Sequence, residues 1–218
     1  MLATEPFGEA EERRDLRRMV RDVLGRHLPV EAALAADREG RFDWAAWRAL
    51  GAAGVLGLGA PEESGGGGGT VGDALAVVEE VARVLPSLAV DYVTCGMAMR
   101  MLADGTAGRA AEWLPRIASG EAVCAFGLSE PNAGTDLLAL RTSARERGGD
   151  WVLTGQKLWI SLAQEAEVIF VLARTDPPEE GRRSRGLSVI AVPVDQPGVT
   201  VRRVPLMGMR AAVSCEVF

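Results

Sequence analysis

The chain has 218 residues, of which 48% are hydrophobic, and its 24 basic and 30 acidic side chains give a formal net charge of −6. This length allows one large or two ordinary domains with a sizeable core, and the interspersed charges argue against a general nucleic-acid surface, which needs a basic face. Because His27 is the only histidine, the chain by itself excludes Ser-His-Asp and Cys-His catalysis and a multi-histidine metal site.

The cysteines and the hydropathy pattern bear on the compartment. Cys95, Cys124 and Cys215 lie far apart without metal-ligand spacing, so we interpret them as reduced, small apolar residues of a cytoplasmic protein. The sequence shows no apolar run behind a basic stretch at its start and no apolar segment long enough to cross a bilayer. We therefore expect a cytoplasmic protein with no bound metal and with neither a nucleic-acid nor a membrane partner.

The first half of the chain has helical periodicity. A charged amphipathic helix is predicted over residues 9–28, because Leu16, Val20 and Leu24 recur at helical spacing, and Pro29 ends it. Asp43 is the predicted N-cap of a second helix, residues 44–53. Further helices are predicted over residues 72–85, with Leu75, Val78 and Val81 or Ala82 as the buried stripe, over residues 88–102 after a separating Pro86-Ser87, and over residues 106–117.

Two features of this half allow a binding interpretation beside a structural one. The glycine run at residues 65–69 lacks a following Lys-Ser/Thr and a clear preceding strand, so we interpret it as a loop between helices and not as a phosphate loop. Met97, Met99 and Met101 could line an apolar ligand tunnel, but methionines at this spacing more often fill a core.

After Glu121 the pattern changes to short β-branched runs separated by Gly, Pro and Asp, at residues 168–173, 187–194, 199–204 and 213–218. The predicted fold class is therefore α+β. It consists of an N-terminal all-α helical bundle domain, residues 1–121, followed by a β-barrel-like middle domain, residues 122–218.

The first segment with chemical character begins as an apolar run, residues 123–128, that meets a polar corner, residues 129–136. Pro131 fixes its own φ and favours an extended Glu130, while Asn132 and Gly134 tolerate unusual backbone angles. We expect a strand that stops abruptly and exposes backbone N–H groups beside the hydroxyls of Ser129 and Thr135.

The second such segment, residues 151–161, alternates apolar residues around Gly155, which predicts two strands joined by a tight turn. It ends in Trp159-Ile160-Ser161, a flat aromatic ring next to a hydroxyl. Donors at the end of one strand, with a ring and a donor at the end of another, would suit a flat heterocycle with a polar edge.

Together these segments resemble the acyl-CoA dehydrogenase family, whose middle domain carries aromatic-x-x-T/S-E-P-x-A-G-S/T-D and then G-x-K-x-W-I-T/S. Residues 126–136 and 155–161 carry the two patterns, with Lys157 in place. Two long motifs in the right order and spacing are a specific signal. The resemblance covers nearly the whole chain, and Pro61-Glu62 with the following glycines matches the family's P-E-x-x-G-G stretch.

The resemblance implies an FAD site and an acyl-CoA site. Ser129 and Ser161 would donate to the pyrimidine edge of the flavin, Trp159 would pack against its rings, and Gly134 would allow close backbone approach. The implied cofactor-binding residues are Phe126, Leu128, Ser129, Gly134, Thr135, Trp159, Ile160 and Ser161. The implied substrate-binding residues are Thr135 and Ser184. Arg183 is a further candidate, because arginine binds phosphate in a fork, although a solvated loop explains the arginines at 182, 183 and 185 equally well.

The implied reaction is α,β-dehydrogenation of an acyl-CoA thioester, with hydride transfer to flavin N5 and reoxidation by an electron-transfer flavoprotein. Family members usually continue into a C-terminal four-helix domain that supplies the catalytic glutamate and much of the subunit interface. We therefore expect a truncated chain, with a naturally short protein that depends on a separate chain as the alternative. We also expect a homo- or hetero-oligomer and predict no catalytic residue within this chain. Glu130 and the Met207-Gly208-Met209-Arg210 turn are interpreted as structural.

Three alternatives stay open on the sequence. A flavin monooxygenase or nitroalkane-oxidase-like enzyme would share the fold and the flavin. A non-catalytic subunit would hold acyl-CoA or a partner without flavin. A pathway-specific dehydrogenase would act on a thioester of a carrier protein instead of CoA.

Overall fold

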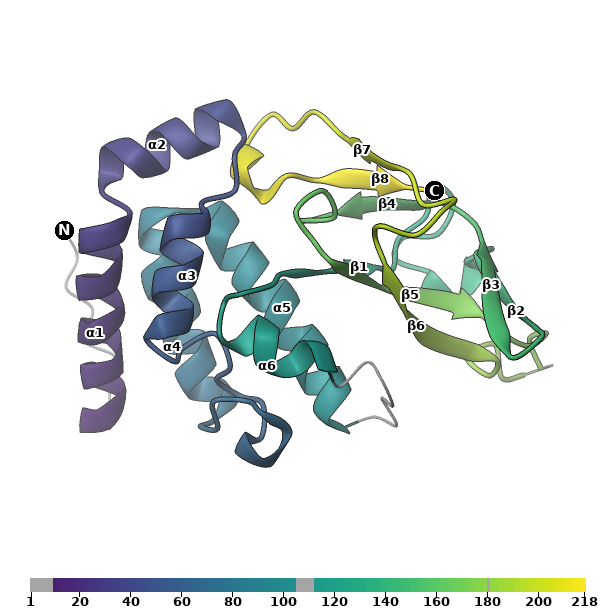
Figure 1. Cartoon of the computed structure of the whole chain (residues 1–218), viewed down its shortest axis with the longest axis horizontal. Coiled ribbons are helices and arrows are strands. Elements are labelled where there is room, and N and C mark those ends of the chain that lie inside the picture. Colours follow the sequence, from purple (N-terminus) through teal and green to yellow (C-terminus); the bar gives the residue numbers. More distant parts are fainter. Residues whose placement is uncertain (1–9, 105–111, 180) are drawn as a thin grey trace.

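The computed structural model describes residues 10–104, 112–179 and 181–218, and its helices and strands gather on opposite sides of the molecule (Figure 1). The helical elements are α1 (Glu11–His27), α2 (Val30–Glu39), α3 (Trp44–Ala52), η1 (Glu62–Ser64), α4 (Val71–Val84), α5 (Pro86–Asp104) and α6 (Trp113–Ala118). The predicted α+β fold class is confirmed. The last helix ends at Ala118 and the first strand begins at Cys124, while the proposed domain boundary at residue 121 stays a prediction.

Local sequence signals explain three of the helix ends. The side chain of Asp43 accepts a hydrogen bond from the backbone N–H of Ala46 at 3.0 Å, as its N-cap prediction requires. Thr70 and Asp73 form a capping box at the start of α4. Helix α2, which was not predicted from the sequence, ends at Gly40. This glycine has the left-handed conformation, with a φ of 62°.

Three helical expectations need correction or fall outside the described residues. The two predicted helices are separate, but the break falls at Leu85 and Pro86 is the first residue of α5, because proline is well tolerated at the first helical position. Leu75 is 56% exposed and Val77 is buried in its place, whereas Val81 is buried as predicted. The predicted helix over residues 106–117 lies partly outside the described residues, and α6 covers its end.

The strands form two sheets. They are β1 (Cys124–Gly127), β2 (Ser143–Arg147), β3 (Asp150–Thr154), β4 (Lys157–Ile160), β5 (Val168–Arg174), β6 (Leu187–Pro193), β7 (Val201–Arg203) and β8 (Cys215–Val217). The larger sheet has the order β1-β5-β2-β3, with β6 also paired to β5, and the smaller has the order β4-β8-β7. Strand β1 runs parallel to β5, with Cys124 opposite Val168 and Gly127 opposite Val171. Short 3-10 turns, η3 (Leu137–Ala139) and η4 (Arg210–Ala212), lie between strands.

The two strands predicted on either side of Gly155 are present as β3 and β4, but they do not pair with each other as a hairpin. Strand β3 pairs with β2, whereas β4 pairs with β8 in the other sheet. A side chain at Gly155 would come within 2.3 Å of the hydroxyl oxygen of Thr142, so the chain passes between the sheets where only glycine fits. The alternating pattern correctly predicted strands; β3 pairs with its neighbour in sequence, β2, whereas the partner of β4 lies about 55 residues farther along the chain.

A continuous hydrophobic core joins the helices to the strands. Helix α5 contacts both β1 and η4 and so lies between the remaining helices and the sheets (Figure 1). At this contact the thiol of Cys95 lies 3.7 Å from the carbonyl oxygen of Cys124, and both side chains are buried. Among the residues that the structure describes, no helix is long and apolar enough to span a membrane.

Candidate functional site

The two sequence motifs meet in one hollow of about 170 Å³, which we call the motif hollow. Strand β1 and the residues after it contribute Phe126, Leu128 and Ser129. Strand β4 and the residue after it contribute Leu158, Trp159, Ile160 and Ser161. Six of the eight predicted cofactor-binding residues therefore lie around one space, although they come from two different sheets.

A hydrogen bond and a buried ion pair hold the two motif segments together. The backbone N–H of Leu158 donates to the carbonyl of Ser129 at 2.9 Å. The ammonium of Lys157 donates to the carbonyl of Leu128 at 3.1 Å and to the carboxylate of Glu130 at 2.9 Å. Since both charged side chains are buried, these contacts fix the end of β1 against β4 and thereby define one wall of the hollow.

Glu130 has a structural environment. Its carboxylate also accepts hydrogen bonds from the backbone N–H groups of Arg141, at 2.7 Å, and Thr142, at 2.9 Å. Burial alone would raise its pKa, but Thr142, the Arg141 amide and Lys157 together lower the pKa to about 2. A carboxylate held ionised by three partners is a poor proton acceptor at neutral pH, which supports the interpretation of Glu130 as a corner residue.

Lys157 shows the cost of this arrangement. Burial lowers the pKa of its ammonium, although the hydrogen bond and the charge of Glu130 oppose that shift. The pair therefore depends on both partners, because either charge alone would be left in a buried place.

Trp159 lies in an unusual backbone conformation. Its φ is 63°, in the left-handed region, and the pairing of β4 with β8 shifts register between Lys157 and Ile160. For a bulky residue this conformation costs about 1–3 kcal/mol and persists only where the surroundings impose it. The bulge leaves Trp159 59% exposed beside the hollow, so a flat ring has an aromatic face available for stacking.

The donor set suits a flat ring with a polar edge. Within the described residues, the hydroxyls of Ser129 and Ser161 have no hydrogen-bond partner of their own, and both border the motif hollow. The other walls are apolar, with Phe126 and Ile160 among them. An isoalloxazine ring needs this combination of donors on one edge and apolar surfaces on its faces.

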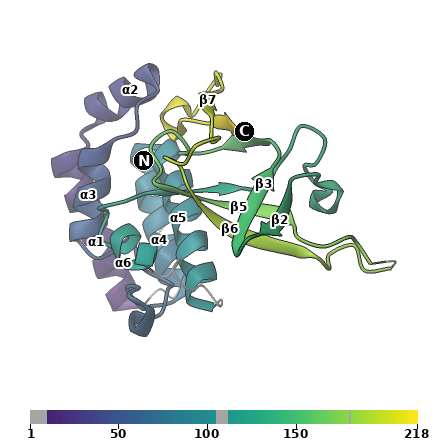
Figure 2. The same cartoon turned by 45° about the vertical axis from the view of Figure 1, so that its right-hand side comes forward.

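The remaining predicted residues lie elsewhere. Gly134 and Thr135 are exposed and do not line the motif hollow. The guanidinium of Arg183 donates to Asp136 at 2.8 Å, which brings the loop between β5 and β6 to the corner that follows β1. Figure 2 shows that this loop extends away from the helices. Thr135, Arg183 and Ser184 are thus placed near one another but outside the hollow.

Comparisons with known proteins agree with this geometry. The sequence profile of the acyl-CoA dehydrogenase N-terminal domain matches residues 10–121, and that of the acyl-CoA dehydrogenase middle domain matches residues 125–218. This chain belongs to the acyl-CoA dehydrogenase family. The family comprises flavoprotein oxidoreductases of acyl-CoA metabolism.

Individual relatives of this acyl-CoA dehydrogenase family member are similar along almost the whole chain. The mitochondrial isovaleryl-CoA dehydrogenase of Pongo abelii is 33% identical over 215 residues, which are 96% of this chain and 50% of the relative. The structure of a glutaryl-CoA dehydrogenase in complex with glutaryl-CoA matches with a TM-score of 0.86 and 31% identity, over 98% of this chain and 54% of that one.

A glutaryl-CoA dehydrogenase of Mycobacterium smegmatis in complex with FADH2 matches with a TM-score of 0.84 and 27% identity, over 96% of this chain and 52% of that one. The chain thus spans about half the length of the relatives it matches.

Helix α5 contributes two residues to the hollow of this family member that the sequence reading did not assign to it, Thr94 and Met97. The methionine spacing was the available signal, but core filling was the favoured interpretation. The methionines of α5 in fact have different environments, because Met97 is 51% exposed beside the hollow while Met99 is fully buried in the core. Thr94 carried no signal, since a lone threonine within a helix predicts nothing about a site.

Proposed function

We propose that the chain forms the helical and middle portions of an FAD-dependent acyl-CoA dehydrogenase that oxidises the α,β bond of an acyl-CoA thioester. The observation that supports this proposal is the meeting of two distant motifs in one hollow that has two free hydroxyls and one exposed indole. Bound FAD would supply the hydride-accepting chemistry. We expect an electron-transfer flavoprotein to take up the electrons and the complete protein to be an oligomer.

The residues of the motif hollow would bind and orient the flavin. Ser129 and Ser161 would donate hydrogen bonds to the edge of the ring where negative charge accumulates on reduction, which favours the reduced form. Trp159 would cover part of the ring system and exclude water from it. Phe126, Leu128 and Ile160 would supply apolar contact.

The loops outside the hollow would hold the nucleotide end of the substrate. Arginine binds phosphate in a fork, and Arg183 lies near Thr135 through its ion pair with Asp136. Both members of that pair are about half exposed, so a phosphate group could replace Asp136 as the partner of Arg183 at little cost. Ser184 and Gly134 border the same region in the sequence.

No residue of this chain is proposed as the catalytic base. The carboxylate beside the hollow, Glu130, is held ionised by Lys157 and two amides. We propose that the proton-abstracting glutamate belongs to a C-terminal helical domain, as the family resemblance implies. This chain would then position the flavin and the thioester against that base.

Flavin binding by paired tryptophan variants tests the proposal. Trp159→Ala removes the indole at the hollow, while Trp151→Ala removes a second exposed indole, in β3, that does not line it. In a titration followed by flavin fluorescence, we expect Trp159→Ala to weaken FAD binding about tenfold or more and Trp151→Ala to leave it unchanged, because stacking contributes about 1–3 kcal/mol.

Three outcomes would overturn the proposal. Equal affinities in the two variants would remove Trp159 from the site. Failure of the unaltered protein to bind FAD, with retained binding of acyl-CoA, would favour a non-catalytic binding subunit. Rapid O2 consumption by the reduced protein in stopped-flow mixing would favour a monooxygenase or oxidase.

A further inference from the structure

Backbone strain is concentrated in two turns that contact each other. Within the described residues, the non-glycine residues with positive φ are Trp159 and Leu162, both at 63°, Met209 at 53° and Val213 at 46°. We call residues 159–162 the tryptophan turn and residues 209–213 the methionine turn. The backbone N–H of Leu162 donates to the carbonyl of Ala212 at 3.2 Å, which joins the two turns. Such conformations persist only when neighbouring groups impose them.

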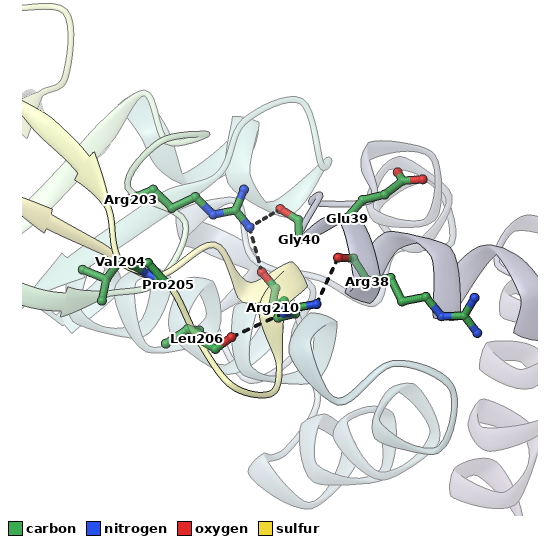
Figure 3. Close-up of a pocket in the computed structure, with 8 residues that line it drawn as sticks. All are labelled: Arg38, Glu39, Gly40, Arg203, Val204, Pro205, Leu206 and Arg210. Atoms are coloured by element: carbon green, nitrogen blue, oxygen red, sulfur yellow. Dashed lines mark hydrogen bonds between the residues drawn. The ribbon is translucent and has the colours of Figure 1, made fainter.

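Two arginines hold the methionine turn against the helical half. Arg203, in β7, donates through Nη2 to the carbonyl of Gly40 at 2.6 Å and to that of Arg210 at 3.3 Å (Figure 3). Arg210, in η4, donates through Nη1 to the carbonyl of Arg38 at 3.3 Å and through Nε to that of Leu206 at 3.4 Å. Two of the acceptors belong to the end of α2, where helix carbonyls lack partners within the helix and carry partial negative charge.

A third contact strengthens this attachment. The backbone N–H of Ala211 donates to the carboxylate of Asp37 at 3.3 Å, and the hydroxyl of Ser87, at the start of α5, donates to the same oxygen at 3.1 Å. The methionine turn is therefore bound to the end of α2 and, through Asp37, to the helix that lines the motif hollow.

The same arginine lies in register with the motif hollow. Arg203 pairs with Cys215 across β7 and β8, and Cys215 pairs with Ile160 across β8 and β4. Ile160 lines the motif hollow and is followed by Ser161. A displacement of Arg203 would therefore be transmitted through Cys215 of β8 to Ile160 of β4, which borders the hollow.

These arginines line a second hollow of about 420 Å³, which we call the arginine hollow. Its size and charge suggest an anion site, but its hydrogen bonds argue against one. The guanidinium groups of Arg203 and Arg210 face carbonyl oxygens, which repel an anion, and the side chains of Arg38 and Glu39 extend away from them (Figure 3).

We propose that Arg203 and Arg210 are positioning residues for the motif hollow: they hold the strained methionine turn on the end of α2 and thereby hold the tryptophan turn in the conformation that presents Trp159 and Ser161. The effect on flavin rests on the proposed function. The effect on the conformation of the tryptophan turn does not require flavin and is tested separately.

Hydrogen exchange in the flavin-free protein is the first test. Arg203→Ala is compared with Arg202→Ala, its neighbour in β7, whose guanidinium lies 5.1 Å from the ring centre of Phe218 and does not reach α2. Losing the bonds of Arg203 should accelerate exchange of the amides in residues 157–162 about tenfold and weaken FAD binding by a similar factor. Arg202→Ala should change neither quantity, and Arg203→Lys, which lacks the planar fork, should restore only part of the loss.

A glycine variant distinguishes positioning from general stability. Met209→Gly places at a φ of 53° a residue that adopts this conformation without strain. In the Arg203→Ala background it should slow exchange in residues 157–162 and recover FAD affinity at least severalfold. If Arg203→Ala changes only the melting temperature, or if exchange in residues 157–162 matches that of Arg202→Ala, the positioning role is wrong. If exchange responds as expected but the unaltered protein binds no FAD, the positioning role stands and the proposed function fails.

Discussion

The motif hollow and the arginine hollow differ in volume and in whether their polar side chains are hydrogen-bonded within the protein. The two properties select different hollows as the binding site. The arginine hollow measures about 420 Å³, but the guanidinium groups that line it donate to backbone carbonyls. The motif hollow measures about 170 Å³, yet within the described residues its two serine hydroxyls have no partner. Volume alone would select the first. Hydroxyl donors that no protein group occupies are available to a ligand, and they select the second.

The comparison separates groups that stabilise the fold from groups that are available for binding. Removing an occupied group should cost stability and affect ligands only indirectly. Removing a free group should cost little stability and weaken binding directly. The variants below apply this distinction to residues around the motif hollow, beginning with the largest expected change.

Glu130→Ala should give the largest loss of stability, because it leaves the ammonium of Lys157 buried without its partner. Breaking one side of a buried ion pair costs about 3–5 kcal/mol. Urea unfolding would measure the loss, with Glu146→Ala as the control, since Glu146 is an exposed glutamate in β2. A loss below that of the control would show that Glu130 is not the occupied corner residue that its contacts indicate.

The same carboxylate predicts an acid-dependent loss of stability. Its pKa is lowered to about 2, from an ordinary value of 4.5, so the folded state binds fewer protons than the unfolded state between these limits. The contribution of Glu130 should be complete above the ordinary pKa and should be lost as the pH falls toward 2. Glu130→Gln should flatten this part of the stability profile, and an unchanged profile would contradict the assignment.

Asp91→Asn should have the opposite sign. Asp91 lies in α5, one turn before Thr94 of the motif hollow, and is fully buried with neither carboxylate oxygen hydrogen-bonded within the described residues. Burial, with a smaller contribution from Cys95, raises its pKa well above the ordinary value of 3.8. The folded state therefore keeps a proton that the unfolded state releases, and stability falls as the pH rises above 3.8.

Replacing Asp91 by asparagine removes this penalty, so the variant should be about 1–3 kcal/mol more stable at neutral pH. The gain should disappear in acid, where the carboxyl group is protonated in both states. Asp22→Asn, at an exposed position of α1, is the matched control and should change little. Thermal unfolding at pH 3 and pH 7 distinguishes this mechanism from a general gain in helix stability, which would appear at both values.

How far the sequence predicts this structure depends on the range of the interaction. Asp43 caps α3 as predicted, because a cap involves residues within one turn. The strands on either side of Gly155 were predicted, but their pairing was not, because the partner of β4 is β8, which lies far along the chain. The order of the strands in the sheets could likewise not be predicted, because alternating apolar residues indicate a strand but not its partner.

The candidate site follows the same rule. Six residues could be predicted because the family motifs contain them, and the structure places them around one hollow. Thr94 and Met97 were not assigned to it, since only the packing of α5 against β1 brings them there. Arg203 had no local signal at all, because its role depends on the end of α2, which lies 163 residues away in the sequence.

Ser129→Ala tests the free groups of the motif hollow. The hydroxyl has no partner within the described residues, so its removal should leave the free energy of unfolding nearly unchanged. A hydrogen bond contributes about 0.5–1.5 kcal/mol, so FAD binding should weaken about two- to tenfold and the midpoint potential of the bound flavin should become more negative. Ser143→Ala in β2, outside the hollow, is the control. A stability loss without a change in affinity would place Ser129 among the occupied groups.

Gly134→Ala should cause no loss of stability and isolates the role of close ligand approach. A methyl group at Gly134 would meet nothing within 4 Å, and the φ of Gly134 is not positive. At Gly186, by contrast, φ is 72° and a methyl group would lie 2.6 Å from the carbonyl oxygen of Asp176.

The protein itself therefore requires glycine at position 186 but not at 134, and Gly134→Ala should stabilise the fold by about 0–1 kcal/mol through the unfolded state. If a ligand backbone or phosphate must approach this corner closely, the same variant weakens its binding while stability is kept. Unchanged affinity for both FAD and acyl-CoA would mean that glycine at 134 serves neither the fold nor the site.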